Sequence, residues 1–143
     1  MEPFPRDDET AAFGRQATQL KAAGDWDGAI TCLRAQVERM LVSPVHYPVE
    51  QWCRLGLVLQ QAGRYKEAVE HFEWLLEDLP RRARAEAFMD DPSRSFGKTS
   101  KKSVCNQIVK YQTEQIRYNA ALAATREERR LAKLAKKRDD GVS

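Results

Sequence analysis

Residues 51–80 read QWCRLGLVLQQAGRYKEAVEHFEWLLEDLP, and this stretch decides the fold. In its first part, apolar residues recur at the three- and four-residue steps of one helix face: Trp52, Leu55, Leu59 and Ala62. Gly63 predicts the end of that helix, because glycine adopts the left-handed conformation without a Cβ penalty. A second apolar stripe runs from Tyr65 to Leu79, and Pro80 predicts its end because proline disrupts a helix interior. The stretch therefore predicts two antiparallel helices joined by a tight turn.

A weaker copy of this pattern lies upstream, in FGRQATQLKAAGDWDGAITCLRAQVERML (residues 13–41). Aligning Gly24 with Gly63 gives an offset of 39 residues. The alignment matches the following pairs: Trp26 with Tyr65, Ala29 with Ala68, Leu33 with Phe72 and Phe13 with Trp52. The segment SPVHYP, residues 43–48, contains two prolines and predicts an extended connector between the copies.

The spacing resembles the tetratricopeptide repeat (TPR) family, whose pattern places these residue types at fixed offsets. The matching residues are Trp52, Leu55-Gly56, Ala62-Gly63, Tyr65, Ala68, Phe72 and Pro80. One clear repeat covers about residues 49–80, and a weaker one covers about residues 10–42. The resemblance implies an all-α fold of helix-turn-helix repeats. Because two repeats leave apolar surface uncovered, the rest of the chain should supply a cap.

The remaining sequence predicts that cap as a short helix and one long C-terminal helix. Residues 81–90 form the short helix, and residues 10–90 together form the repeat domain. Residues 91–98 are a loop, because Asp-Pro, Ser and Gly interrupt the pattern there. Residues 99–138 contain neither proline nor glycine and predict one helix. We expect it to pack on the repeats through an apolar stripe and to project at its basic end; the stripe comprises Val104, Ile108, Tyr111, Tyr118 and Leu122. Residues 1–9 and 139–143 are expected to be flexible or disordered.

Composition and charge indicate a soluble protein whose two halves differ in charge. Of the 143 residues, 42% are hydrophobic and 31% are charged, values typical of a globular domain. The net charge is +3, and the basic residues concentrate after residue 80. The N-terminus MEPFPRDDET lacks the apolar core of a secretory signal, and no apolar run has membrane-spanning length. We therefore expect a cytoplasmic location and no membrane partner.

The motifs that carry catalysis or metal binding are missing from the sequence. His46 and His71 have no Cys or His neighbour at metal-ligand spacing. The string Gly97-Lys98-Thr99 resembles part of a phosphate-binding loop, but Pro92 stands where that loop needs its first glycine. We therefore expect a protein that is not an enzyme and needs no cofactor.

The TPR resemblance implies a binding scaffold whose first helices line a groove for a partner peptide or helix. The positions that correspond to this groove are Arg15, Thr18, Lys21, Glu50, Arg54, Leu57, Gln60 and Gln61. The leading hypothesis is an adaptor that binds another protein through this groove or through the long helix. Apolar burial with a few charged contacts would supply the affinity.

Two alternatives remain open at this point. The C-terminal helix could bind nucleic acid through a basic surface, which comprises Arg126, Arg129, Arg130, Lys133, Lys136 and Lys137. Against this hypothesis, Glu127 and Glu128 interrupt the cluster, and aromatic stacking residues are missing there. Alternatively, the chain could be a structural homodimer built on the long helix, with the groove occupied by the protein itself.

Overall fold

Helices are the only regular elements in the computed structural model, which describes residues 8–43, 47–89 and 98–141. Within the described helices, the side chains of residues 83–89 and 98–106 are not placed. The elements are α1 (Asp8–Ala22), α2 (Trp26–Val42), α3 (Val49–Gln61), α4 (Tyr65–Met89) and α5 (Lys98–Asp140). The prediction of an all-α fold is therefore confirmed. The expectations for residues 1–7, the connector residues 44–46 and most of the 91–98 loop fall outside the described residues.

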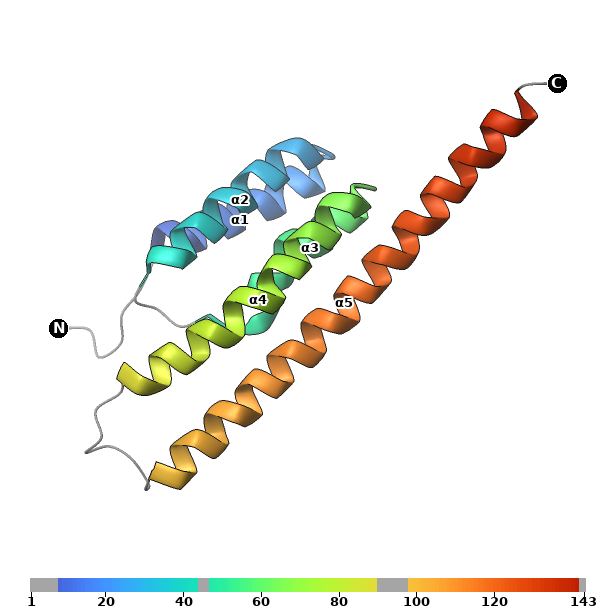
Figure 1. Cartoon of the computed structure of the whole chain (residues 1–143). Coiled ribbons are helices and arrows are strands. Elements are labelled where there is room, and N and C mark those ends of the chain that lie inside the picture. Colours follow the sequence, from blue (N-terminus) through green and yellow to red (C-terminus); the bar gives the residue numbers. More distant parts are fainter. Residues whose placement is uncertain (1–7, 44–46, 90–97, 142–143) are drawn as a thin grey trace. The chain divides into compact units, whose positions relative to one another are not determined.

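The chain divides into two units, Met1–Ala68 and Val69–Ser143, so the division falls within α4. In the first unit, α1 and α2 lie side by side and run in opposite directions, and α2 also packs against α3 (Figure 1). The largest fully buried side chains of this unit include Ile30, Leu33, Met40 and Leu59. These residues give the α1–α3 unit an apolar core of its own.

The turns after α1 and α3 are built in the same way. Gly24 and Gly63 have positive φ angles of 82° and 79°, the left-handed conformation that favours glycine. In both turns an amide N–H donates back to the carbonyl of the residue five positions earlier, from Asp25 to Leu20 (2.8 Å) and from Arg64 to Leu59 (2.8 Å). This bond satisfies one of the carbonyls left open at a helix end. The predicted helix end at Gly63 is therefore confirmed.

The offset of 39 residues between the glycines also relates buried positions on the flanking helices. Ala29 and Ala68 are both completely buried, each near the start of the helix that follows the turn. Leu33 and Phe72 lie four residues further on, and both are buried. The chain thus repeats a small residue followed by a large one on the buried side of α2 and α4.

Helix α4 contradicts one prediction, because it continues through Pro80 to Met89. The predicted helix end at Pro80 and the separate short helix at 81–90 are therefore wrong. Proline removes one backbone donor from a helix, but neighbouring contacts offset that loss here. Leu75 and Leu79 are buried just before the proline. Asp78 accepts hydrogen bonds from Arg81 and Arg82, both 2.9 Å long, which link the turns on either side of Pro80.

Helix α5 is the longest element, 43 residues from Lys98 to Asp140. At 1.5 Å per residue it is about 64 Å long. Its bounds are close to the predicted 99–138, but its buried side differs from the expected apolar stripe. Ile116 and Ala123 are completely buried, whereas Tyr111 and Tyr118 are 50% and 65% exposed. All four residues of the expected stripe whose side chains are described therefore lie at the surface: Ile108, Tyr111, Tyr118 and Leu122.

Candidate functional site

The first candidate surface lies on α1 and α3, which Arg54 joins. The guanidinium of Arg54 on α3 donates to the backbone carbonyl of Gly14 (3.1 Å) and to the hydroxyl of Thr18 (2.6 Å), both on α1. The Thr18 hydroxyl in turn donates to the Gly14 carbonyl (3.1 Å). Since Gly14 and Arg54 are 40 residues apart in sequence, these bonds fix one helix against another. Arg54 is therefore a structural link as well as a predicted groove residue.

Gly14 allows this close approach because it has no side chain. A Cβ atom at this position would lie 2.7 Å from the Nε2 atom of Gln36 and 3.0 Å from the Nη1 atom of Arg54. The Gln36 amide is itself buried and donates to the carbonyl of Thr10 (2.9 Å). Position 14 lies within the weaker repeat predicted from the sequence, but its packing role was not predicted. A glycine in the middle of a predicted helix was the available signal, because glycine there is unfavourable without a packing reason.

The eight predicted groove residues do not share one environment. Arg15, Thr18, Glu50, Leu57 and Gln61 are exposed, Arg54 is half-buried, and Gln60 is buried. Lys21 is half-buried, with its ammonium 5.9 Å from the ring centre of Trp26, an arrangement that favours a cation–π contact. We call the five exposed residues, together with Arg54 between them, the first-helix surface. On α3, its members Glu50, Arg54, Leu57 and Gln61 follow steps of four and three residues and so occupy one side of the helix.

Ion pairs connect α2 to the start of α4 on another part of the same unit. Glu67 accepts hydrogen bonds from Arg64 (2.9 and 2.8 Å) and from Arg34 on α2 (2.6 Å). Arg64 also pairs with Asp27 at 3.1 Å. The hydrogen bond from Arg64, aided by the positive charge of Arg34, lowers the pKa of the Glu67 carboxyl. Every charge in this cluster has a partner, so its geometry favours a structural role.

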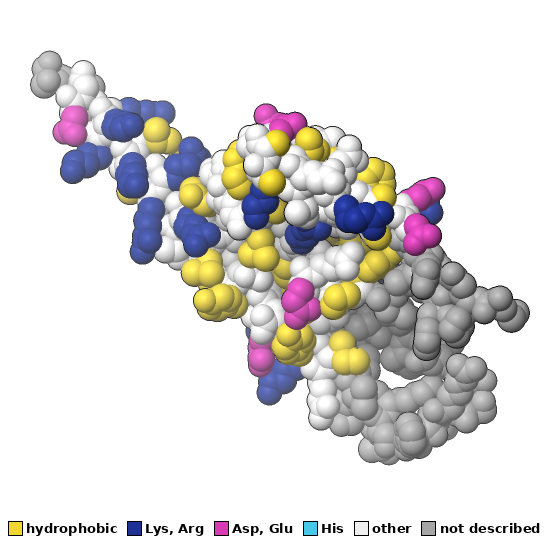
Figure 2. Space-filling model, turned by 180° about the vertical axis from the view of Figure 1, so that it is seen from behind, with side chains coloured by type: hydrophobic (Ala, Val, Ile, Leu, Met, Phe, Trp, Pro, Cys, Tyr) yellow, Lys and Arg dark blue, Asp and Glu magenta, His cyan; other side chains and the backbone are white. Residues whose placement is uncertain are grey.

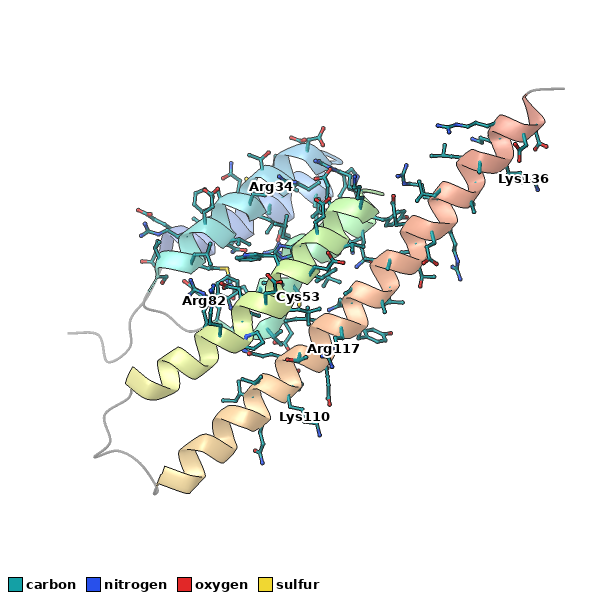
Figure 3. The ribbon with its side chains drawn as sticks, in the orientation of Figure 1. Arg34, Cys53, Arg82, Lys110, Arg117 and Lys136 are labelled. Carbon is teal, nitrogen blue, oxygen red and sulfur yellow. The ribbon has the colours of Figure 1, made fainter. Side chains whose placement is uncertain are left out.

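The second candidate surface is on α5, where the predicted basic residues are all exposed. Figure 2 shows Lys and Arg side chains gathered toward the C-terminal end of this helix. Arg130 is held by Glu127 through two hydrogen bonds of 2.9 and 2.7 Å, which raise the pKa of its guanidinium. Figure 3 shows Lys110, Arg117 and Lys136 extending from different points along α5. From residue 128 to 141 every residue is exposed, so this stretch contributes little to a buried core.

Apolar side chains are exposed on α5 ahead of the basic residues. Ile108, Tyr111, Tyr118 and Leu122 are each more than a third exposed. With Gln115 counted between Tyr111 and Tyr118, they recur in steps of three and four residues and so share one side of the helix. The buried residues Ile116 and Ala123 lie about 120° away around the helix at 3.6 residues per turn. Helix α5 thus has two apolar stripes, only one of which is covered.

The described residues offer no candidate metal site. They contain no group of three or more Cys, His, Asp or Glu side chains that could hold a metal ion. His71 contacts the neighbouring rings of Phe72 and Trp74, with ring centres 5.9 Å apart in each case. In the same described part of the chain, none of the helices has the length and apolar character needed to span a bilayer.

No protein-family model matches the chain, and no curated protein or solved structure is significantly similar to it.

Proposed function

We propose that this protein is a non-catalytic interaction module of the tetratricopeptide type, which binds a peptide or helix of another protein. The observation that carries the proposal is the link between α1 and α3 through Arg54. This link holds the two helices together while Arg15, Glu50 and Leu57 remain exposed. Two helices joined by hydrogen bonds can present their exposed side chains in a fixed arrangement, and such preorganisation reduces the entropy cost of binding.

The chemistry of the first-helix surface supports recognition of an amphipathic segment. Leu57 is 39% exposed and offers an apolar contact at the middle of α3. Relative to Leu57, Glu50 stands about two turns away and Gln61 about one turn away on the same side of α3, and Arg15 lies on α1. An apolar anchor with polar residues around it is the usual organisation of a protein-binding site. A partner helix with an apolar residue against Leu57 fits this arrangement.

The repeat spacing supports the same proposal independently. The equivalent turns at Gly24 and Gly63, and the buried small and large residues that follow them, agree with the alignment of two repeats. Repeats of this type stack into surfaces that bind extended partners. Such binding requires neither a metal nor a cofactor.

The test compares Leu57→Asp with Val42→Asp in the full chain. Both substitutions introduce a carboxylate at an exposed apolar position, but Val42 lies at the end of α2, outside the first-helix surface. The tagged wild-type chain would capture proteins from an extract of the source cells, and mass spectrometry would identify them. The affinity of each recovered candidate would then be measured with purified components by calorimetry.

We expect Leu57→Asp to weaken binding of the true partner about tenfold or more, which corresponds to about 1.4 kcal/mol. Val42→Asp should change the same affinity less than about twofold. Circular dichroism would confirm that both variants keep the wild-type helix content. Equal affinities for the wild type and Leu57→Asp, across all captured proteins, would contradict a site on the first-helix surface.

A further inference from the structure

One side of α5 carries a continuous line of exposed side chains that changes in character along the helix. Its first half is apolar and consists of Ile108, Tyr111, Tyr118 and Leu122, with Gln115 between the tyrosines. Its second half is basic and consists of Arg126, Arg129, Lys133 and Lys137, all exposed. The steps along this line are three or four residues throughout and average about 3.6, the period of the helix. We call this line the α5 outer face.

The outer face is long enough for a helical partner. From position 108 to position 137 it extends about 44 Å at 1.5 Å per residue. Its apolar half has the spacing by which one helix packs against another. Tyr118, at 65% exposed, and Ile108, at 47%, therefore have substantial apolar area left to bury. The basic half then requires carboxylates on the partner, because charged groups at an interface need compensation.

A second copy of α5 does not meet this requirement. In a parallel pair, the basic half of one copy would lie along the basic half of the other. In an antiparallel pair, Lys133 and Lys137 would face the apolar half, which holds no carboxylate among its outer-face residues. In both arrangements, Lys133 and Lys137 face no carboxylate of the partner's outer face.

A nucleic acid or a membrane surface also fits less well. Proteins that bind single strands combine a basic groove with aromatic residues along it, whereas here the tyrosines and the basic residues occupy separate stretches. Glu114 lies beside the apolar half and would repel a polyanion. A membrane-surface helix carries a broad apolar face along the same stretch as its basic residues, whereas the large exposed apolar side chains described in the basic stretch of α5 are Leu131 and Leu134 alone.

We propose that the α5 outer face docks an amphipathic helix of another protein, in which an apolar stripe leads into a run of Asp and Glu. The apolar stripe covers Ile108 to Leu122, and the carboxylates pair with Arg126 to Lys137. This inference rests on the proposed function as an interaction module. It adds a second surface and the chemistry of its partner.

The test uses a designed fluorescent peptide about 30 residues long, the length of helix that covers the outer face. One half of the peptide carries Leu at three- and four-residue steps, and the other half carries Glu. A second peptide has Lys in place of each Glu, and oligo(dT) serves as the polyanion probe. Fluorescence anisotropy with the full chain gives the affinity for each probe.

Two matched pairs of variants locate the binding site. Tyr118→Asp is compared with Leu131→Asp, because Leu131 is 52% exposed but lies on another side of α5. Lys133→Glu is compared with Arg138→Glu, which makes the same charge change more than a third of a turn away. We expect the acidic peptide to bind in the micromolar range and the lysine peptide not to bind. Tyr118→Asp should weaken binding about tenfold and Lys133→Glu about threefold to tenfold, while each control changes it less than about twofold.

Several results would overturn this inference. Absence of binding by the acidic peptide, or equal losses for Tyr118→Asp and Leu131→Asp, would exclude the proposed docking face. Tighter binding of oligo(dT), lost in Lys133→Glu and steeply weakened by salt, would assign the face to nucleic acid instead. A dimer in analytical ultracentrifugation that Tyr118→Asp dissociates would assign the face to a second copy.

The Leu57→Asp variant separates this inference from the proposed function. We expect Leu57→Asp to bind the acidic peptide as the wild type does. If the peptide fails to bind the wild type while Leu57→Asp still loses a captured protein, only the α5 inference falls. If neither Leu57→Asp nor Tyr118→Asp affects any binding, both proposals fall.

Discussion

The α1–α3 region and the second half of α5 are both helical, but different kinds of contact support them. In α1–α3, hydrogen bonds join residues far apart in sequence, as between Arg54 and Gly14 or between Gln36 and Thr10. In α5 beyond Ala123, Thr125 donates to the Ala121 carbonyl and Arg130 donates to Glu127, and each of these bonds spans about one turn of the same helix. The comparison teaches that helical structure alone does not indicate a packed core. The exposed residues 128–141 of α5 are consistent with the binding role proposed for this helix.

The largest expected difference between these regions comes from truncating a leucine in each. Leu33 is 1% exposed, so Leu33→Ala should lower the free energy of unfolding by about 2–5 kcal/mol through lost burial and a residual cavity. Leu131 is 52% exposed, so Leu131→Ala should change the free energy of unfolding by less than about 0.5 kcal/mol. Urea denaturation followed by circular dichroism measures both values. A loss for Leu131→Ala as large as that for Leu33→Ala would show that the end of α5 belongs to a packed core.

A smaller effect is expected when the link between α1 and α3 is removed. Arg54→Met keeps an unbranched apolar side chain but loses the bonds to Gly14 and Thr18, which should cost about 1–3 kcal/mol. Arg15→Met removes an exposed arginine from α1 and serves as the control, with an expected change of less than about 0.5 kcal/mol. The same denaturation experiment compares them. Equal stabilities would mean that Arg54 does not hold the two helices together.

The smallest effect concerns the ion pairs of Glu67 and depends on pH. Because Arg64 lowers the pKa of the Glu67 carboxyl in the folded state, the pairing stabilises the protein fully above the ordinary pKa of 4.5. This contribution is lost as the pH falls through the lower folded-state pKa. The side chains are more than a third exposed, so solvent screening limits the effect to about 0.5 kcal/mol.

Glu67→Gln tests this pH dependence against Glu70→Gln, which alters an exposed glutamate on the same helix. Thermal denaturation should show a lower Tm for Glu67→Gln at pH 7, and the difference from wild type should disappear once the pH falls below the lowered folded-state pKa of Glu67. Glu70→Gln should follow the wild type across the range. A difference for Glu67→Gln that persists in acid would indicate a loss of packing in place of a loss of charge pairing.

Local rules in the sequence accounted for the helical class and for two of the helix ends. Gly24 and Gly63 end α1 and α3 because the left-handed conformation depends on a residue and its immediate neighbours. The same kind of rule failed at Pro80, where buried neighbours and the bonds of Asp78 with Arg81 and Arg82 support a continuous helix. The periodic spacing in α5 correctly predicted a long helix. The spacing could not identify the covered side of α5. The buried residues Ile116 and Ala123 form a second apolar stripe, which has fewer and smaller side chains than the exposed one.

The sequence by itself thus determined which residues form helices, because hydrophobic period and turn chemistry are properties of short segments. Only the tertiary structure decided which side chains of those helices remain accessible. Gln60 was predicted to face a groove but is buried, and Arg54 binds the backbone of α1. Tyr118 was predicted to lie in a packed stripe but is exposed. Burial depends on contacts between segments distant in sequence, which the spacing within a single helix does not specify.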